Sequence, residues 1–202
     1  MLYNYNIVTS RPDPFLKRVA PDEMPDNLRA AWRESMALRG DAAFFEVFGN
    51  NPGLYEWYTG SFYREVFHGG TVPRRIKELV RLRLSNVHGC RFCNQGNRVD
   101  ALGAGLTETE IDSLSDYENA PFNAAEKAAL RLADQMLLTN PDGALSQSLY
   151  DDLKTHFSDG ELLELGLIMA VLSGMAKLLF AFDLVEKEDY CIFSAGGKTS
   201  QE

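Results

Sequence analysis

The sequence predicts an all-α fold of about eight helices. Strand-like alternation is scarce, whereas nearly every long segment repeats apolar residues at the three- and four-residue spacing of a helix. Prolines and glycines punctuate these segments, and several have a capping residue at their start. We expect an extended arm over residues 1–25, one helical domain over 26–194 and a disordered tail over 195–202.

The arm is predicted from its four prolines, which disfavour regular structure. Its apolar side chains are expected to lie on the domain or on a neighbouring subunit; they are Leu2, Tyr3, Tyr5 and Phe15.

Proline and glycine set the boundaries of most helices in the first half. Pro52 and Pro73 suit the first turn of a helix, and Gly89 suits a helix end. Helices are therefore expected over residues 26–38, 42–48, 52–69, 73–88 and 90–104. The aromatic-rich helix from Pro52 is expected to bury Leu54, Tyr55, Tyr58, Phe62 and Val66 on one face, either in the core or in an oligomer interface.

Capping boxes start most helices in the second half. The pairs Thr107 and Glu110, Asn123 and Glu126, and Ser158 and Glu161 all have the required spacing, and Ser146 is a further cap. They predict a short helix after Thr107 and helices over 127–138, 147–156 and 159–184. The apolar run over 165–176 is too short to span a bilayer, so we expect a buried core helix.

Composition narrows the functional classes. The net charge is −9, whereas a nucleic-acid binder usually carries a basic surplus. Three cysteines are too few for a secreted disulfide framework, and the start lacks the pattern of a signal peptide. We expect a cytoplasmic protein that binds neither membrane nor nucleic acid. The one basic cluster is interpreted as a solvated helix face or a site for an acidic partner subunit; it comprises Arg74, Arg75, Lys77, Arg81 and Arg83.

The sequence Cys90-Arg-Phe-Cys93 is the strongest chemical signal. Thiols at i and i+3 lie on the same side of a helical turn and can form a disulfide. Because Gly89 is expected to end the preceding helix, both sulfurs should lie at the amino end of the next one. The helix dipole stabilises a thiolate there.

Four interpretations of this pair compete. Two buried, inert cysteines are the simplest. Structural zinc needs a companion pair of ligands, and haem attachment needs a histidine where Asn94 stands. Thiol–disulfide or peroxidatic chemistry is favoured, and no metal or cofactor is expected. Cys191, after the last long helix, is expected to be structural.

The stretch from Glu78 to Glu108 resembles the carboxymuconolactone decarboxylase/alkyl hydroperoxidase D (AhpD) family, in its peroxidase-related branch. Eleven residues separate Glu78 from Cys90-x-x-Cys93, as in the thiol-dependent members, and the flanking apolar and turn pattern also fits. Outside this motif the likeness is diffuse, although it covers most of residues 50–185.

This resemblance implies an AhpD-like orthogonal helical bundle with an antiparallel helical-hairpin core, assembled as a dimer, trimer or hexamer. It also implies that Cys93 attacks a small organic hydroperoxide, that Cys90 resolves the product to a disulfide, and that an external dithiol or protein reductant restores the thiols.

One position departs from the family pattern. The histidine expected four residues after the second cysteine, the family's base, is Asn97 here, and an amide cannot take up a proton. His88 is a candidate replacement, although a capping or surface histidine is the simpler interpretation. The resemblance assigns Glu78 to a proton relay through a water, whereas its neighbours alone favour a solvated side chain.

Two other functions stay open. One is a decarboxylase of the carboxymuconolactone type, a branch that generally does not depend on a Cys-x-x-Cys pair. The other is a non-catalytic oligomeric redox sensor, which the loss of the family histidine at Asn97 favours.

Overall fold

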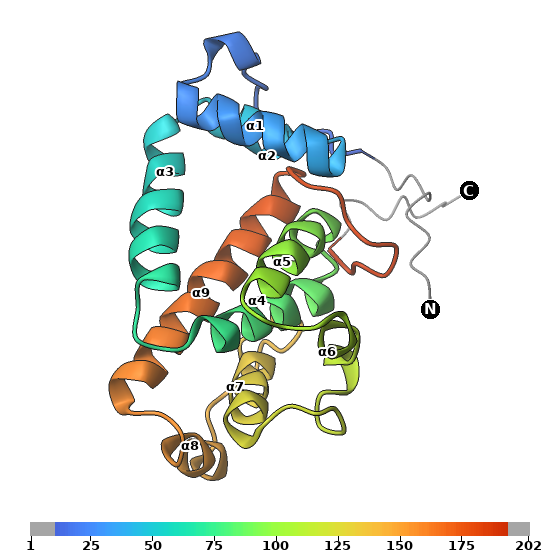
Figure 1. Ribbon diagram of the computed structural model, residues 1–202. Coiled ribbons are helices and arrows are strands. Elements are labelled where there is room, and N and C mark those ends of the chain that lie inside the picture. Colours follow the sequence, from blue (N-terminus) through green and yellow to red (C-terminus); the bar gives the residue numbers. More distant parts are fainter. Residues whose placement is uncertain (1–10, 194–202) are drawn as a thin grey trace, which may run out of the picture.

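The computed structural model describes residues 11–193, which form helices and no strand (Figure 1). The all-α prediction is therefore confirmed. The α-helices are α1 (Asp26–Arg39), α2 (Ala43–Phe48), α3 (Pro52–Glu56), α4 (Arg74–His88), α5 (Arg91–Gly103), α6 (Glu108–Asp112), α7 (Ala124–Gln135), α8 (Gln147–Lys154) and α9 (Asp159–Ala181). The shorter or differently wound segments are η1 (Pro21–Glu23), η2 (Trp57–His68) and η3 (Leu114–Asp116).

Helix α4 is the centre of the fold. It packs against α5, α7 and α9, and a tight connection at Gly89 joins it to α5 as a helical hairpin (Figure 1). Val80 and Leu84 lie in the apolar cluster shared with α7 and α9, whereas Leu79 and Leu82 lie in the cluster shared with α5, α6 and η3. Because α4 is covered on several sides, its polar side chains also enter the interior.

The capping signals in the sequence are confirmed. Thr107, Asn123 and Ser158 each accept a hydrogen bond from the backbone three residues on, and the glutamate at that position bonds back in a capping box. Ser146 accepts from the Leu149 amide. These bonds satisfy amide groups that a helix start otherwise leaves unpaired.

The aromatic helix differs from its prediction. Only α3 is α-helical, and the chain continues as the π-helical segment η2. A π-helix bonds residue i to i+5 and so changes which residues share a face. Leu54, expected to be buried, is 54% exposed, whereas Phe62 and Phe67 are buried. Helices α7 and α9 also end a few residues earlier than expected, at Gln135 and Ala181.

Only part of the basic cluster on α4 is solvated: Arg74 is exposed, but other members enter the interior. Lys77 and Arg81 are almost fully buried. Nζ of Lys77 lies 2.6 Å from a carboxylate oxygen of Glu164 on α9 and donates to the Val66 carbonyl. Arg75 pairs with Glu126 of α7 in the same way. The interpretation as a solvated face was therefore wrong for Lys77 and Arg81, which are buried, and Lys77 and Arg75 tie α4 to α9 and α7.

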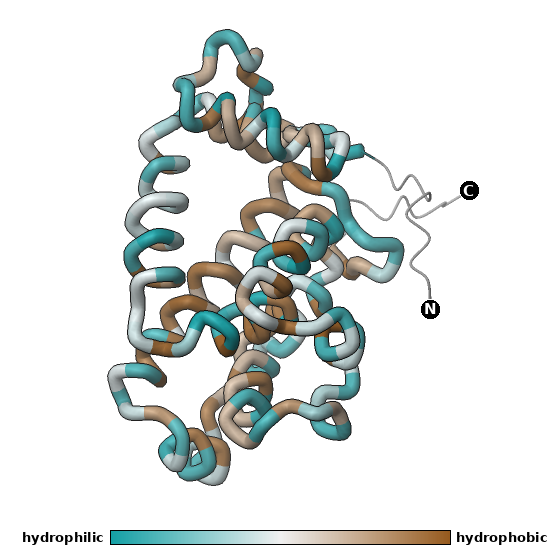
Figure 2. Tube along the Cα trace, viewed as in Figure 1, coloured by the Kyte–Doolittle hydropathy of each residue, from teal (hydrophilic) through white to brown (hydrophobic). Residues whose placement is uncertain are grey.

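Helix α9 is long and apolar (Figure 2). By length and composition alone it is the one described helix that could cross a membrane, but a third of its apolar window is buried, and core helices have the same composition. One face, with Leu165 and Ile168, lies in the core, while Leu163 and Leu167 are exposed. The expected core helix is therefore only half covered by the described residues.

The described part of the arm packs unevenly. Val19 and Met24 lie in the core cluster formed with α1 and α2, whereas Phe15 is 81% exposed. Leu2, Tyr3, Tyr5 and the predicted tail lie outside the described residues.

Candidate active site

The two cysteines of the motif form a disulfide at the amino end of α5. Gly89 caps α4 in the left-handed conformation, with φ of 70°, and Cys90 is the N-cap of α5. The Cys93 amide donates to Sγ of Cys90 over 3.2 Å. The predicted break at Gly89 and the predicted position of both sulfurs are confirmed.

The segment after α9 covers one of the two sulfurs. The Glu188 amide donates to the Gly89 carbonyl over 2.8 Å, and the Phe92 amide donates to the Glu186 carbonyl over 3.3 Å. Cys90 is consequently fully buried, whereas Cys93 is only partly buried. Cys93 is the sulfur that a reactant can reach.

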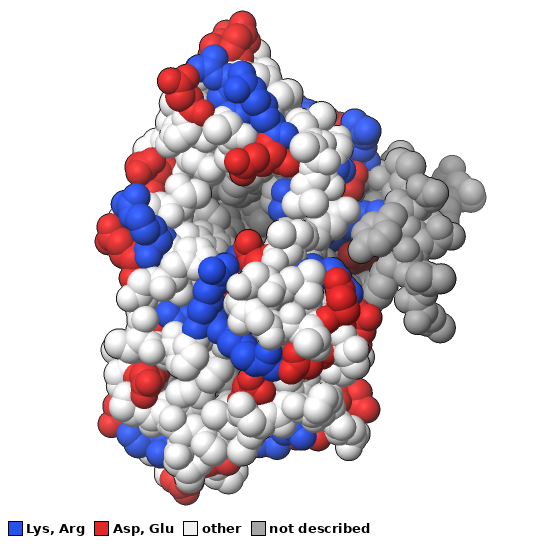
Figure 3. Space-filling model, in the orientation of Figure 1, with Lys and Arg blue, Asp and Glu red and all other residues white. Residues whose placement is uncertain are grey.

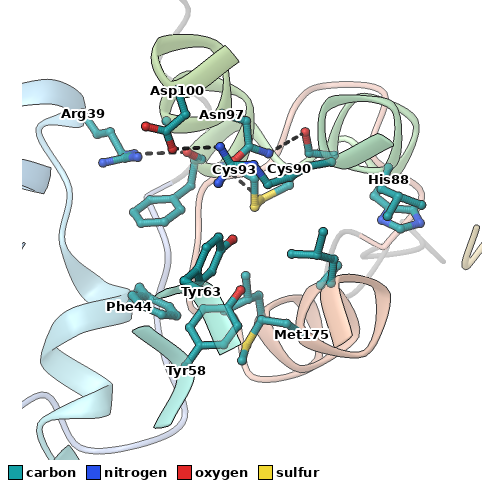
Figure 4. Close-up of a pocket in the computed structure, with 18 residues that line it drawn as sticks. Arg39, Phe44, Tyr58, Tyr63, His88, Cys90, Cys93, Asn97, Asp100 and Met175 are labelled. Atoms are coloured by element: carbon teal, nitrogen blue, oxygen red, sulfur yellow. Dashed lines mark hydrogen bonds and ion pairs between the residues drawn. A yellow bond between two sulfur atoms is a disulfide. The ribbon is translucent and has the colours of Figure 1, made fainter. Parts of the chain in front are cut away.

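A cavity of about 190 Å³ lies beside the disulfide, between α1, η2, α4, α5 and α9. Figure 3 shows the surface hollowed between α1 and α5, with acidic and basic groups on the rim. Aromatic and aliphatic side chains form much of the wall (Figure 4); among them are Phe44, Tyr58, Tyr63, Phe92, Leu172, Met175 and Leu179. A cavity of this volume, with this wall, favours a small, partly apolar molecule.

Asn97 lines this cavity one helical turn after Cys93. Its side chain is 9% exposed, and Nδ2 donates to Oγ of Ser85 over 3.0 Å. Ser85 in turn donates to the Leu82 carbonyl. The position of the family histidine therefore holds a fixed amide, which can orient a hydrogen-bonding ligand but cannot remove a proton.

His88 is buried rather than on the surface, so the simpler sequence interpretation was wrong about its exposure. It contributes to the cavity lining, but Figure 4 shows its ring to one side of the disulfide. Its Nε2 accepts a hydrogen bond from the Leu138 amide over 3.0 Å. Burial lowers the pKa of His88 to about 4. The ring is thus neutral with one lone pair engaged, and its role as a base stays a prediction.

Glu78 is also fully buried, so the solvated interpretation was wrong. Its carboxylate lies 3.3 Å from Arg74 and 2.5 Å from Arg81. Burial nevertheless raises its pKa, because the cost of desolvation exceeds the attraction of Arg81. Glu78 is not part of the cavity wall, whereas Arg81 is. A relay from Glu78 would have to pass this guanidinium, which does not release its proton.

Tyr58 and Tyr63 were not predicted as site residues. They are five residues apart, and the π-helical winding of η2 directs both toward the cavity. Figure 4 shows both hydroxyl groups pointing toward the disulfide. Burial, with a further contribution from Tyr63, raises the pKa of Tyr58 well above its usual value. Tyr58 therefore stays protonated and can donate a hydrogen bond.

Arg39 of α1 is a second residue that the sequence did not indicate. Its Nε donates to the Phe92 carbonyl over 3.1 Å, and its guanidinium carbon lies 4.3 Å from the centre of the Phe92 ring. Burial lowers its pKa. No local pattern marks it, because its contact with Phe92 joins residues 53 positions apart in the chain.

Cys191 lies next to the site. Its Sγ donates to the His88 carbonyl over 3.0 Å, and it packs in the same apolar cluster as Cys90. Burial raises the pKa of its thiol, which disfavours the reactive thiolate. Its structural role stays a prediction. Between residues 11 and 193, no group of three or more His, Cys, Asp or Glu side chains is arranged to hold a metal ion.

Together these features define a class: an all-α protein with a disulfide-forming Cys-x-x-Cys pair at a helix start, beside a small apolar cavity. Residues 52–135 match the sequence profile described as the Carboxymuconolactone decarboxylase family. The resemblance that the motif predicts is thus confirmed by the profile match over this segment.

Two sequence relatives illustrate the match. The uncharacterized protein YdfG of Bacillus subtilis is 29% identical over 112 residues, which cover 55% of this chain and 76% of YdfG. An uncharacterized protein of Mycobacterium tuberculosis is 36% identical over 89 residues, 44% of this chain but only 31% of the relative.

Solved structures show the same fold. A variant of the debrominase Bmp8 in complex with 2,3,4-tribromopyrrole has a TM-score of 0.70 at 17% identity, covering 89% of this chain and 95% of Bmp8. An AhpD-core, peroxidase-related protein from Ralstonia eutropha has a TM-score of 0.68 at 14% identity. The match covers 92% of this chain and 97% of that protein. The predicted AhpD-like fold is confirmed.

Proposed function

We propose that this protein reduces small organic hydroperoxides by cycling Cys90 and Cys93 between dithiol and disulfide. The observation that carries this proposal is the asymmetry of the pair: both cysteines line the cavity, but Cys93 is only partly buried, whereas Cys90 is fully buried. A substrate reaches one sulfur, and the other is held within bonding distance to resolve the product.

Oxidation of the thiol pair begins at Cys93. Reduced Cys93 loses its thiol proton to water and attacks the terminal oxygen of R–O–OH. The O–O bond breaks, Cys93 becomes a sulfenic acid, and RO⁻ takes a proton to leave as ROH. The Cys90 thiol then attacks the sulfenic sulfur, forming the disulfide and releasing water.

Several groups support these steps. The amino end of α5 favours a thiolate, which matters because Asn97 replaces the family base. The protonated Tyr58 hydroxyl can donate to the leaving alkoxide, and Asn97 can orient the peroxide. Any further proton transfer by His88 would add to the rate, and Glu78 would contribute indirectly by holding Arg81 against the cavity.

Reduction requires an external dithiol, whose thiolate attacks the exposed Cys93 sulfur. Cys90 leaves as a thiolate, and the Cys93 amide that now contacts its Sγ would stabilise that charge. Exchange with the second thiol of the reductant restores both cysteines. We further propose a cytoplasmic homo-oligomer, for which the exposed Leu163 and Leu167 of α9 provide apolar contact surface.

Reductive dehalogenation is a second candidate. The dithiol would supply two electrons and two protons, converting an aryl halide to the arene, the hydrogen halide and the disulfide. The aromatic cavity wall, with Phe44, Tyr58 and Phe92, suits a flat ring, and the neighbour Bmp8 is a debrominase.

The test uses the fully reduced protein with cumene hydroperoxide and excess dithiothreitol. Cumyl alcohol should form continuously in the wild type and in Cys191→Ser, and should be lost in Cys93→Ser. Full turnover in Cys93→Ser would overturn the proposal. A single turnover that stops at the disulfide would indicate a sensor, and bromide release from 2,3,4-tribromopyrrole without alcohol formation would favour the dehalogenase.

A further inference from the structure

The cavity contains a guanidinium without a carboxylate partner. Arg39 is partly buried, and no Asp or Glu in residues 11–193 lies within ion-pair distance of it. The other arginines in this part of the chain are either ion-paired or, like Arg33, exposed to solvent. Asp41 and Asp100 attract Arg39 only at longer range.

The surroundings of Arg39 hold its charge in place. The Phe92 carbonyl accepts from Nε, Oγ of Ser35 accepts from Nη1 over 3.4 Å, and the Phe92 ring covers the guanidinium. Nη2 lies against Gly96 of α5, where any Cβ would collide with it. Glycine within a helix costs about 0.5–1 kcal/mol relative to alanine. A glycine thus stands at the position of α5 against which Nη2 of Arg39 packs.

The remaining charges of the cavity are already compensated. Arg81 lies 2.5 Å from Glu78 and 2.8 Å from Asp100. A partly buried cation without a counter-ion is unfavourable, whereas a planar guanidinium binds a carboxylate well. Arg39 therefore leaves the cavity with one positive charge for a ligand, opposite the apolar wall formed by Leu172 and Met175.

We propose that the substrate is a carboxylate-bearing organic hydroperoxide whose carboxylate binds Arg39 while its peroxide group reaches Cys93. The substrate class rests on the proposed function, but the anion site does not. Its apolar body would lie between Phe44, Tyr58 and Met175, which line the same cavity.

Binding is tested first, without turnover. Calorimetry on the disulfide form compares 4-isopropylbenzoate with the neutral 4-isopropylbenzamide. The wild type should bind the carboxylate at least about tenfold more tightly, the size expected for one charge-assisted hydrogen bond. Arg39→Gln should remove this preference, and so should Gly96→Ala, because its Cβ displaces Nη2 without removing the charge. Arg33→Gln, on the exposed side of α1, is the matched control. An unchanged preference in Arg39→Gln would overturn the proposal.

Turnover is then compared for cumene hydroperoxide and its para-carboxylate. In the wild type kcat/KM should favour the carboxylate, and Arg39→Gln should lower that ratio by roughly tenfold, mainly through KM. An unchanged ratio would overturn the substrate assignment. Carboxylate binding without consumption of either hydroperoxide would instead contradict the proposed function and leave the anion site standing.

Discussion

Arg81 separates Glu78 from the cavity beside the disulfide. Its guanidinium lies 2.5 Å from the Glu78 carboxylate and 2.8 Å from Asp100, and it lines the cavity, which Glu78 does not. The glutamate of the family motif thus acts here on a cation. We infer that Glu78 is a positioning residue, which holds Arg81 against the cavity and contacts no reactant.

Glu78→Gln tests this role. The substitution leaves the buried Arg81 with Asp100 as its remaining carboxylate, so the free energy of unfolding should fall by about 1–3 kcal/mol. The pH at which the Cys93 thiol of Cys90→Ser becomes reactive toward iodoacetamide should stay the same. A rise of one pH unit or more in that midpoint would instead place Glu78 in the proton relay.

Asn97→His tests the missing base. A histidine at this position would line the cavity one turn after Cys93 and could remove its proton, an effect worth about 10²-fold or more. We expect a faster single-turnover reaction of the reduced protein with cumene hydroperoxide at pH 7. Asn97→Gln, which keeps an amide, serves as the control and should give no increase. Equal rates in the two variants would mean that proton removal does not limit this step.

Local patterns predicted the helix starts and the place of the thiol pair. Gly89, Cys90 and the three capping boxes act through neighbours within a few residues, so the sequence alone is sufficient there. The burial of Glu78 could not be predicted in the same way. Helix α4 buries seven consecutive residues from Ile76 to Leu82, so no amphipathic pattern distinguishes its faces.

The remaining site residues depend on features that the sequence does not mark. Tyr58 and Tyr63 share a face only because η2 winds as a π-helix. Arg39 enters the cavity through a tertiary contact with Phe92 and Gly96.

The buried His88 predicts a pH dependence of stability. Its pKa is about 4 in the folded protein, against 6.5 for an unperturbed histidine, so between these values only the unfolded chain binds the proton. The free energy of unfolding should therefore fall as pH drops from about 6.5 to 4, by about 2–3 kcal/mol. The raised pKa of Glu78 acts in the opposite direction and cancels when variants are compared.

Denaturant unfolding of His88→Gln against pH checks this expectation. Glutamine can still accept a hydrogen bond from the Leu138 amide. The part of the pH dependence of the free energy of unfolding that is due to His88 should disappear. His156→Gln, at an exposed position, should keep it. Identical slopes in His88→Gln and the wild type would show that His88 is not the titrating group.

Gly89 is expected to be intolerant of a side chain. Its φ is positive, and an added Cβ would lie 2.8 Å from Cβ of Cys191. Gly89→Ala should lower the free energy of unfolding by about 1–3 kcal/mol. Gly103→Ala, in open space at the end of α5, is the matched control and should be near neutral. Equal stability of the two variants would contradict the close packing of Cys191 on this turn.

Trapping of the sulfenic acid shows directly which cysteine attacks the peroxide. Reduced Cys90→Ser and Cys93→Ser are each treated with one equivalent of cumene hydroperoxide in the presence of dimedone, and the adduct is located by mass spectrometry. We predict a dimedone adduct on Cys93 in Cys90→Ser and no adduct on Cys90 in Cys93→Ser. An adduct on Cys90 with none on Cys93 would contradict the assignment of Cys93 as the attacking cysteine.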